Sequence, residues 1–136
     1  MTAAAGTTLA DRIDAMERAF EFMLGYARQE RADETQGQPS PIRDYLKIAD
    51  DALDGLSKIT AGALGAPVNG KAQAAYDAVL RVVHEDALKT REAIALALSQ
   101  PRISSRLIDN INASVHIRAL LTDLFLIDEA LKSGTA

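Results

Sequence analysis

Apolar side chains recur along the first part of the chain at alternating steps of four and three residues. The series consists of Leu9, Ile13, Met16, Phe20, Met23 and Ala27. Because an α-helix repeats every 3.6 residues, this spacing places all six side chains on one helical face. No segment of the sequence shows the two-residue alternation, bounded by turn residues, that a half-buried strand requires. The chain is therefore predicted to be all-α.

Capping and turn residues divide the chain into four predicted helices. Thr8, followed by Asp11, suits the start of the first helix, and Pro41 suits the first position of the second. Asn69 can cap the third helix, and Pro101 marks the break before the fourth. The predicted helices span residues of about 8–31, 41–64, 70–98 and 102–132.

The short connections favour a single up-down-up-down antiparallel four-helix bundle. Neighbouring helices that are joined by a few residues run antiparallel, and two of the three connections are this short. A length of 136 residues, with 48% hydrophobic and 25% charged residues, suits one globular domain over 1–136. Residues 1–7 and 133–136 are expected to be flexible ends, and 32–40 a soft linker.

Composition and charge exclude several classes of function. The chain has no cysteine, which excludes disulfides, thiolate metal sites and cysteine nucleophiles. Its net charge is −4 and its basic residues are scattered among acids, whereas nucleic-acid binding requires clustered lysine and arginine. No signal-peptide pattern or long apolar run occurs, so we expect a cytoplasmic protein with neither nucleic acid nor membrane as its partner.

The fourth predicted helix carries more apolar residues than one buried face can use. Within 119–127, Leu121 and Phe125 can serve the core. Three further residues are then expected on the far side of the helix, where a bundle helix is normally polar: Leu120, Leu124 and Ile127. A helix that is apolar on all sides is covered on all sides. The cover is either a protein partner or second copy of the chain, which is the leading hypothesis, or the N-terminal segment or residues 32–40 of the same chain.

The first predicted helix carries a smaller apolar flank. It consists of Phe22 and Tyr26, which lie outside the main stripe. Gly25 lies on the outer face of the same helix, where it weakens the helix by up to about 1 kcal/mol relative to alanine. A glycine at such a place can permit the close approach of another chain. Phe22 and Tyr26 are therefore added to the predicted partner-binding residues.

The two histidines are the obvious candidates for chemistry. His84 and His116 each lie 16 positions from Gln100, which would bring them to a similar height in a hairpin that turns there. Imidazole is the commonest metal ligand and titrates near neutral pH. A metal needs three or four ligands, however, and no glutamate lies three residues before either histidine, as di-iron bundles require. No metal site and no cofactor are predicted.

His116 also has an architectural parallel. Histidine phosphotransfer domains are four-helix bundles that present one exposed histidine midway along a helix, which is where His116 is expected. Ala119 and Leu120 stand where that family has the lysine and glycine of its His-x-x-Lys-Gly pattern. The parallel is therefore one of architecture, and fold alone does not establish function. His116 is kept as a phosphoacceptor in an alternative hypothesis.

Arg118 is expected on the inner face of the fourth helix, with Glu129 on the same line. A buried guanidinium must be paired, because an unpaired buried charge costs several kcal/mol. A buried ion pair between Arg118 and Glu129 is the structural interpretation. An anchor for an anionic ligand or for a partner's carboxylate is the functional one.

These features together favour a protein that is not an enzyme, because no catalytic arrangement is evident. The leading hypothesis is a cytoplasmic helical-bundle adaptor, regulator or chaperone that docks on a partner through the outer face of the fourth helix. A phosphotransfer protein that uses His116 is the alternative. A binder of a metal or small ligand inside the bundle is the second alternative.

Overall fold

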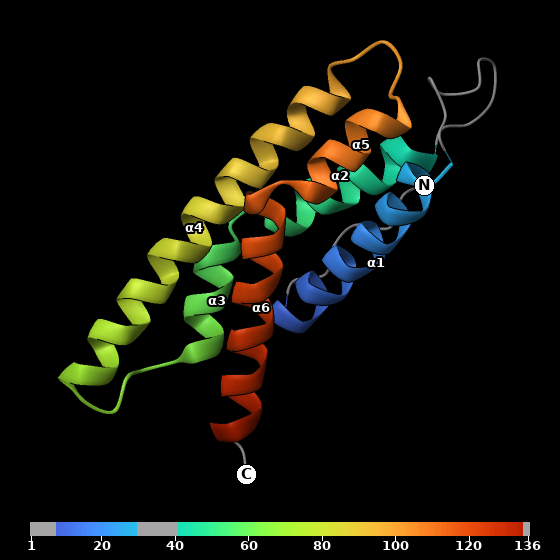
Figure 1. Ribbon diagram of the computed structural model, residues 1–136. Helices are drawn as coiled ribbons and strands as arrows, with labels where there is room; N and C mark the ends of the chain where they lie inside the picture. Colours follow the sequence, from blue (N-terminus) through green and yellow to red (C-terminus); the bar gives the residue numbers. More distant parts are fainter. Residues whose placement is uncertain (1–7, 30–40, 135–136) are drawn as a thin grey trace.

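The computed structural model describes residues 8–29 and 41–134, and within these ranges the chain forms six α-helices and no strand (Figure 1). The all-α prediction is confirmed. The helices are α1 (Leu9–Ala27), α2 (Pro41–Leu53), α3 (Leu56–Leu64), α4 (Gly70–Leu98), α5 (Ser105–Ala113) and α6 (Val115–Gly134). The expectations for 1–7, for 32–40 and for 135–136 lie outside the described residues. The last helix extends to residue 134, two residues beyond the predicted end.

The predicted helix starts are confirmed at two caps. Thr8 Oγ1 accepts a hydrogen bond from Asp11 N at 3.1 Å, and Asp11 Oδ2 accepts one from Thr8 N at 3.4 Å. Asn69 Oδ1 accepts one from Ala72 N at 2.9 Å at the start of α4. Each side chain satisfies a backbone N–H that has no partner within its own helix.

Two of the four predicted helices are each interrupted, so the expectation of four continuous helices is wrong. The segment 41–64 breaks at Gly55, whose φ of 66° and ψ of 20° are left-handed. The segment 102–132 begins as a helix only at Ser105 and breaks again at Ser114, whose φ of −65° and ψ of 146° are extended. Serine has a lower helix propensity than alanine or leucine, so a break at this position costs little.

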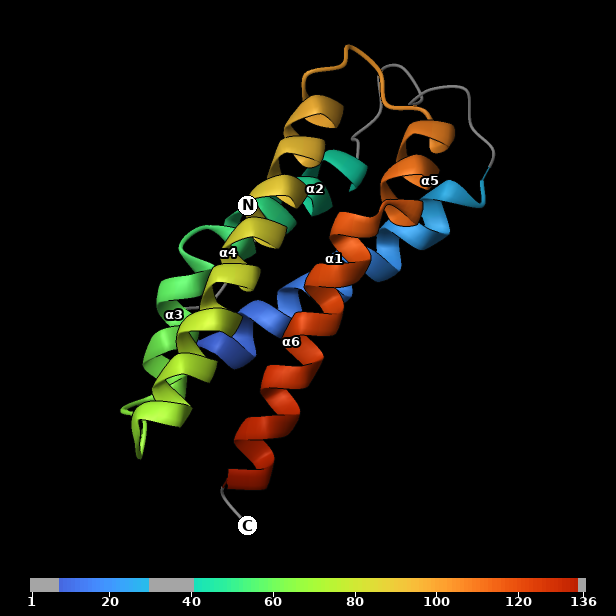
Figure 2. The same cartoon turned by 60° about the vertical axis from the view of Figure 1, so that its left-hand side comes forward.

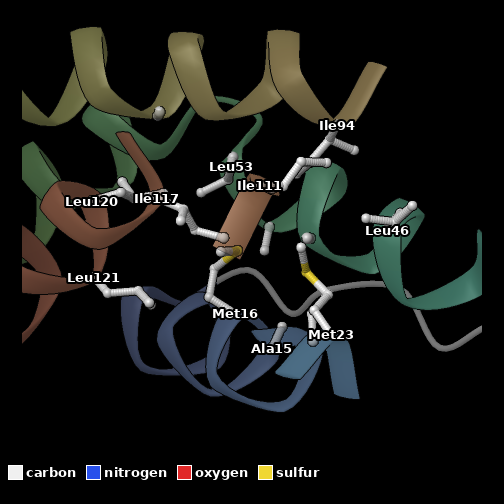
Figure 3. Packing of buried hydrophobic residues seen from close by; sticks show 14 of the residues in the cluster. Ala15, Met16, Met23, Leu46, Leu53, Ile94, Ile111, Ile117, Leu120 and Leu121 are labelled. Atoms are coloured by element: carbon white, nitrogen blue, oxygen red, sulfur yellow. The ribbon is translucent and has the colours of Figure 1, made fainter. Parts of the chain in front are cut away.

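The helices pack around one core. Helix α1 packs mainly on α2 and α5, whereas α4 packs on α2, α3 and α6, as the two views show (Figures 1 and 2). Side chains from α1, α2, α4 and α6 meet between these helices (Figure 3). The largest fully buried side chains include Met16, Met23, Ile42, Leu46, Ile94, Ile108, Ile117, Leu120 and Leu124.

The core face of α6 differs from the predicted one. Leu120, Leu124 and Ile127 are only 0%, 1% and 3% exposed, whereas Phe125 and Leu126 are 52% and 64% exposed. The expectation that the first three form an outer docking face is therefore wrong. The physical reason is the break at residue 114, which lets α6 begin with a new rotational phase. Helical phase carried through that break assigns the apolar residues to the wrong side.

Helix α5 is fastened to the end of α1 by three hydrogen bonds from side chains. The Tyr26 hydroxyl donates to Ile103 O at 2.5 Å, and Ser105 Oγ donates to Tyr26 O at 2.7 Å. Asn112 Nδ2 donates to Met23 O at 3.1 Å. All three bonds are buried, so they fix both the last turn of α1 and the loop before α5.

Arginines from neighbouring helices satisfy the carbonyl ends of α2 and α4. Arg12 Nη1 donates to Asp51 O at 2.6 Å and to Asp54 O at 3.0 Å. Arg43 donates to Leu98 O at 3.1 Å and to Gln100 O at 2.7 Å. Neither α2 nor α4 has a basic residue in its own last turn. The positive charge that favours a helix C-terminus therefore comes from another helix.

Candidate functional site

A surface pocket of about 370 Å³ lies between α1 and α2. Most of its lining comes from one face of α1, where residues three and four positions apart are neighbours. The second helix contributes one aromatic ring. The lining residues are Arg18, Glu21, Phe22, Gly25, Tyr26, Gln29 and Tyr45.

Two aromatic rings from different helices form one wall of the pocket. The centroids of Phe22 on α1 and Tyr45 on α2 are 4.3 Å apart, and the ring planes differ by 11°. Both residues are half-buried. A stacked pair of this kind is rigid and contributes about 0.5–1.5 kcal/mol beyond the area that it buries. The stacked pair therefore gives a bound group a preformed aromatic surface.

Tyr26 and Gly25 also line the pocket. Tyr26 is buried, and its hydroxyl is already used as the donor to Ile103 O. Gly25 leaves a gap in the side-chain cover of α1. Among the described residues, no heavy atom counted as a neighbour lies within 4 Å of the place that a Cβ on Gly25 would occupy. The backbone of α1 is therefore accessible at this point.

Two charged residues of opposite sign, Arg18 and Glu21, line the pocket. Arg18 Nε lies 3.3 Å from Asp14 Oδ2, so the positive charge of Arg18 is offset on its own helix. Glu21 is exposed, and within the described ranges its carboxylate has no ion-pair partner. Glu21 is therefore the lining residue that can pair with a cation.

The chain matches no protein-family model, no curated protein and no solved structure. Its function has to be inferred from its own residues. None of the described helices is long and apolar enough to cross a membrane. Over residues 8–29 and 41–134, no group of three or more histidine, aspartate or glutamate residues could hold a metal ion.

The structure brings together only part of the predicted partner-binding set. Phe22 and Tyr26 line one pocket, whereas the three residues predicted on the last helix lie in the core. Tyr45 was missed as a site residue. It belongs to the apolar stripe of the second predicted helix, and the sequence gives no signal that its ring would stack on Phe22. That relationship depends on the packing of α1 against α2.

Both histidines are exposed, and His116 does not occupy its predicted place. His116 is the second residue of α6 rather than a residue midway along a long helix. His84 lies in the middle of α4 and lines a second pocket, of about 230 Å³, at the junction of α2 and α3. Arg91 and Ser57 line the same pocket. Arg91 is already paired with two aspartates there.

The predicted buried ion pair between Arg118 and Glu129 is wrong. Both side chains are exposed. The prediction placed both residues on the inner face because it carried one helical phase through the break at residue 114, as it did for the apolar residues of α6. Because Arg118 remains in water, it requires no buried partner.

Two carboxyl groups that were not expected to meet face each other between α4 and α6. Asp86 on α4 and Asp123 on α6 are both half-buried. Burial, together with the hydrogen bond and the charge of Asp86, raises the pKa of Asp123 to about 7. The pairing depends on how α6 lies against α4.

Proposed function

We propose that this chain is a non-enzymatic adaptor, regulator or chaperone that docks on a partner protein through the α1–α2 pocket. The observation that carries the proposal is the stacked pair of Phe22 and Tyr45 beside the uncovered backbone at Gly25. Concave, partly apolar surfaces with a few polar groups are typical binding sites. The proposed docking surface is therefore the α1–α2 pocket and no longer the outer face of the last helix.

The occupant that fits best is a partner segment that inserts an arginine side chain. A guanidinium is planar, stacks on aromatic faces and pairs with carboxylates. The pocket offers both features, because the rings of Phe22 and Tyr45 adjoin the exposed carboxylate of Glu21. The negative charge of the chain as a whole also favours a basic partner.

Gly25 supports the same proposal through its backbone. A glycine near the end of a helix weakens that helix, and at Gly25 no neighbouring atom requires the absence of a Cβ. A partner chain that passes close to α1 would account for the glycine, because any larger residue would hold it away.

A matched pair of glycine variants separates binding from folding. Gly25→Ala and Gly62→Ala both place a methyl group in open space within a helix, so each should stabilise the fold by up to about 1 kcal/mol. Only Gly25→Ala should weaken binding, by about threefold to tenfold. Equal binding by both variants and the unchanged protein would contradict a close approach at Gly25.

A blocked peptide, Gly-Gly-Arg-Gly-Gly, is a defined probe of the pocket. In NMR titrations it should shift the signals of 21–29 and of the Tyr45 ring, with a dissociation constant in the millimolar range. The same peptide with citrulline, a neutral analogue of arginine, should bind at least threefold more weakly. Glu21→Gln should remove this preference, and the exposed Glu92→Gln on α4 should not. Equal binding of both peptides to the unchanged protein would exclude a cation site.

Photo-crosslinking with the full chain tests whether the pocket is the docking site. A benzoylphenylalanine at position 18, which lines the pocket and leaves Glu21 in place, should crosslink to a partner peptide that contains arginine, whereas one at position 92 should not. Peptide sequencing of the crosslinked product identifies the occupant. A crosslink into residues 30–40 of the same chain would show that the pocket is filled internally and would overturn the proposal.

A further inference from the structure

Asp86 on α4 and Asp123 on α6 interact across the contact between these two helices. The two helices are in contact, and both carry buried apolar residues: Val83 and Ala87 on α4, and Leu120 on α6. Asp123 Oδ2 is buried and has no hydrogen-bond donor within the described ranges. A buried carboxylate oxygen without a donor is unfavourable, and a second carboxylate beside it increases the cost.

A proton between the two groups resolves this conflict. Two carboxylates have no donor between them, whereas a carboxylic acid can donate to a carboxylate. We propose that Asp86 and Asp123 share one proton across the α4–α6 interface, and that losing this proton loosens α6 from α4. The pair then acts as a pH-sensitive clamp on the C-terminal helix, independently of the docking pocket.

Other charged groups near the pair do not supply the missing charge. Lys89 lies one turn from Asp86 on α4, and His116 lies two turns from Asp123 on α6; both are exposed. On α1, the acids nearest to α6 line a separate pocket with Asp128, one turn beyond Asp123. The pKa of Asp123 is raised by burial first and then by Asp86, with no contribution from a cation.

The direction of the pH effect follows from the raised pKa of Asp123. In the unfolded chain Asp123 has its ordinary pKa of 3.8, so it loses its proton at a much lower pH than in the folded protein. The stabilising contribution is therefore complete below the ordinary pKa and is lost as the pH rises through about 7. Between pH 6 and pH 8 the folding equilibrium constant should fall by up to about tenfold.

Urea unfolding at pH 6, 7 and 8 measures this effect. Asp123→Asn should abolish the pH dependence, because an amide cannot lose a proton in this range. The exposed Asp77→Asn on α4 is the matched control and should retain the dependence. A variant with both His84→Gln and His116→Gln removes the two histidines, the other residue type that can change its charge between pH 5 and pH 8. If this double variant loses the dependence while Asp123→Asn keeps it, the proposal is wrong.

NMR titration of the labelled full chain tests the pair directly. The carboxyl carbon of Asp123 should titrate with a midpoint near 7 and return towards the ordinary aspartate range in Asp86→Asn. Amide hydrogen exchange in α6, corrected for intrinsic rates, should increase from pH 6 to pH 8 more than exchange in α1. An ordinary midpoint for Asp123 in the unchanged protein, or uniform exchange changes in both helices, would overturn the clamp.

Discussion

Arg91 on α4 holds Asp50 on α2 through two hydrogen bonds. Nε donates to Oδ1 at 2.8 Å and Nη2 donates to Oδ2 at 3.4 Å, which is the paired geometry that a guanidinium and a carboxylate favour. Nη1 also donates to Asp54 Oδ1 at 3.3 Å. The hydrogen bond to Asp50 is the largest cause that raises the pKa of Arg91. The bridge ties α4 to α2 next to the break at Gly55.

Replacing Arg91 should loosen this junction. Arg91→Met keeps much of the side-chain length but removes the bridge and leaves two aspartates without their cation. About one third of each paired side chain of Arg91 and Asp50 remains exposed, so we expect a loss of only about 1 kcal/mol in urea unfolding. Arg18→Met is the control, because its pair with Asp14 is largely exposed and should contribute less than about 0.5 kcal/mol. Equal losses in the two variants would contradict the assignment.

Arg12 should contribute to stability through backbone carbonyls. Arg12→Met removes the donors to the last carbonyls of α2, which have no basic residue in their own last turn. We expect a loss of about 1–2 kcal/mol in the free energy of unfolding. The exposed Arg81→Met should change it by less than about 0.5 kcal/mol. An Arg12→Met protein as stable as the unchanged one would refute this role.

Gly55 and Gly65, the two glycines with positive φ in the described residues, should differ in their tolerance of asparagine. Gly55 has φ 66° and ψ 20°, a region that asparagine enters readily, whereas Gly65 has φ 72° and ψ −163°, a region that is essentially restricted to glycine. Gly55→Asn should therefore cost less than about 1 kcal/mol, and Gly65→Asn about 1–3 kcal/mol. Thermal unfolding of both variants measures the difference. The reverse order would show that another contact governs these turns.

Neighbouring apolar residues of α6 should respond in opposite ways. Leu124 is 1% exposed and Phe125 is 52% exposed. Leu124→Ala leaves a cavity in the core and should cost about 2–5 kcal/mol, whereas Phe125→Ala should cost less than about 1 kcal/mol. Chemical unfolding of the two variants compares them under the same conditions. A larger loss for Phe125→Ala would contradict this structure and would support the sequence-based prediction that Phe125 faces the core.

Part of the candidate site could be predicted from the sequence. Phe22, Gly25 and Tyr26 were identified because an apolar flank and a glycine on an outer helical face are visible in the order of residues. Tyr45 could not be identified, because its place beside Phe22 depends on how two helices pack. The same holds for the acid pair of Asp86 and Asp123, since no local pattern distinguishes these two residues from other surface aspartates.

The sequence by itself determined that the chain is helical and where helices start. The period of 3.6 residues and the caps at Thr8 and Asn69 are local properties, set by residues within a few positions of one another. The tertiary structure decided which side of α6 is buried, because the break at Ser114 separates its phase from that of the preceding helix. It also decided which charges meet, since Arg12, Arg91 and Asp123 find their partners on other helices, where sequence distance carries no information.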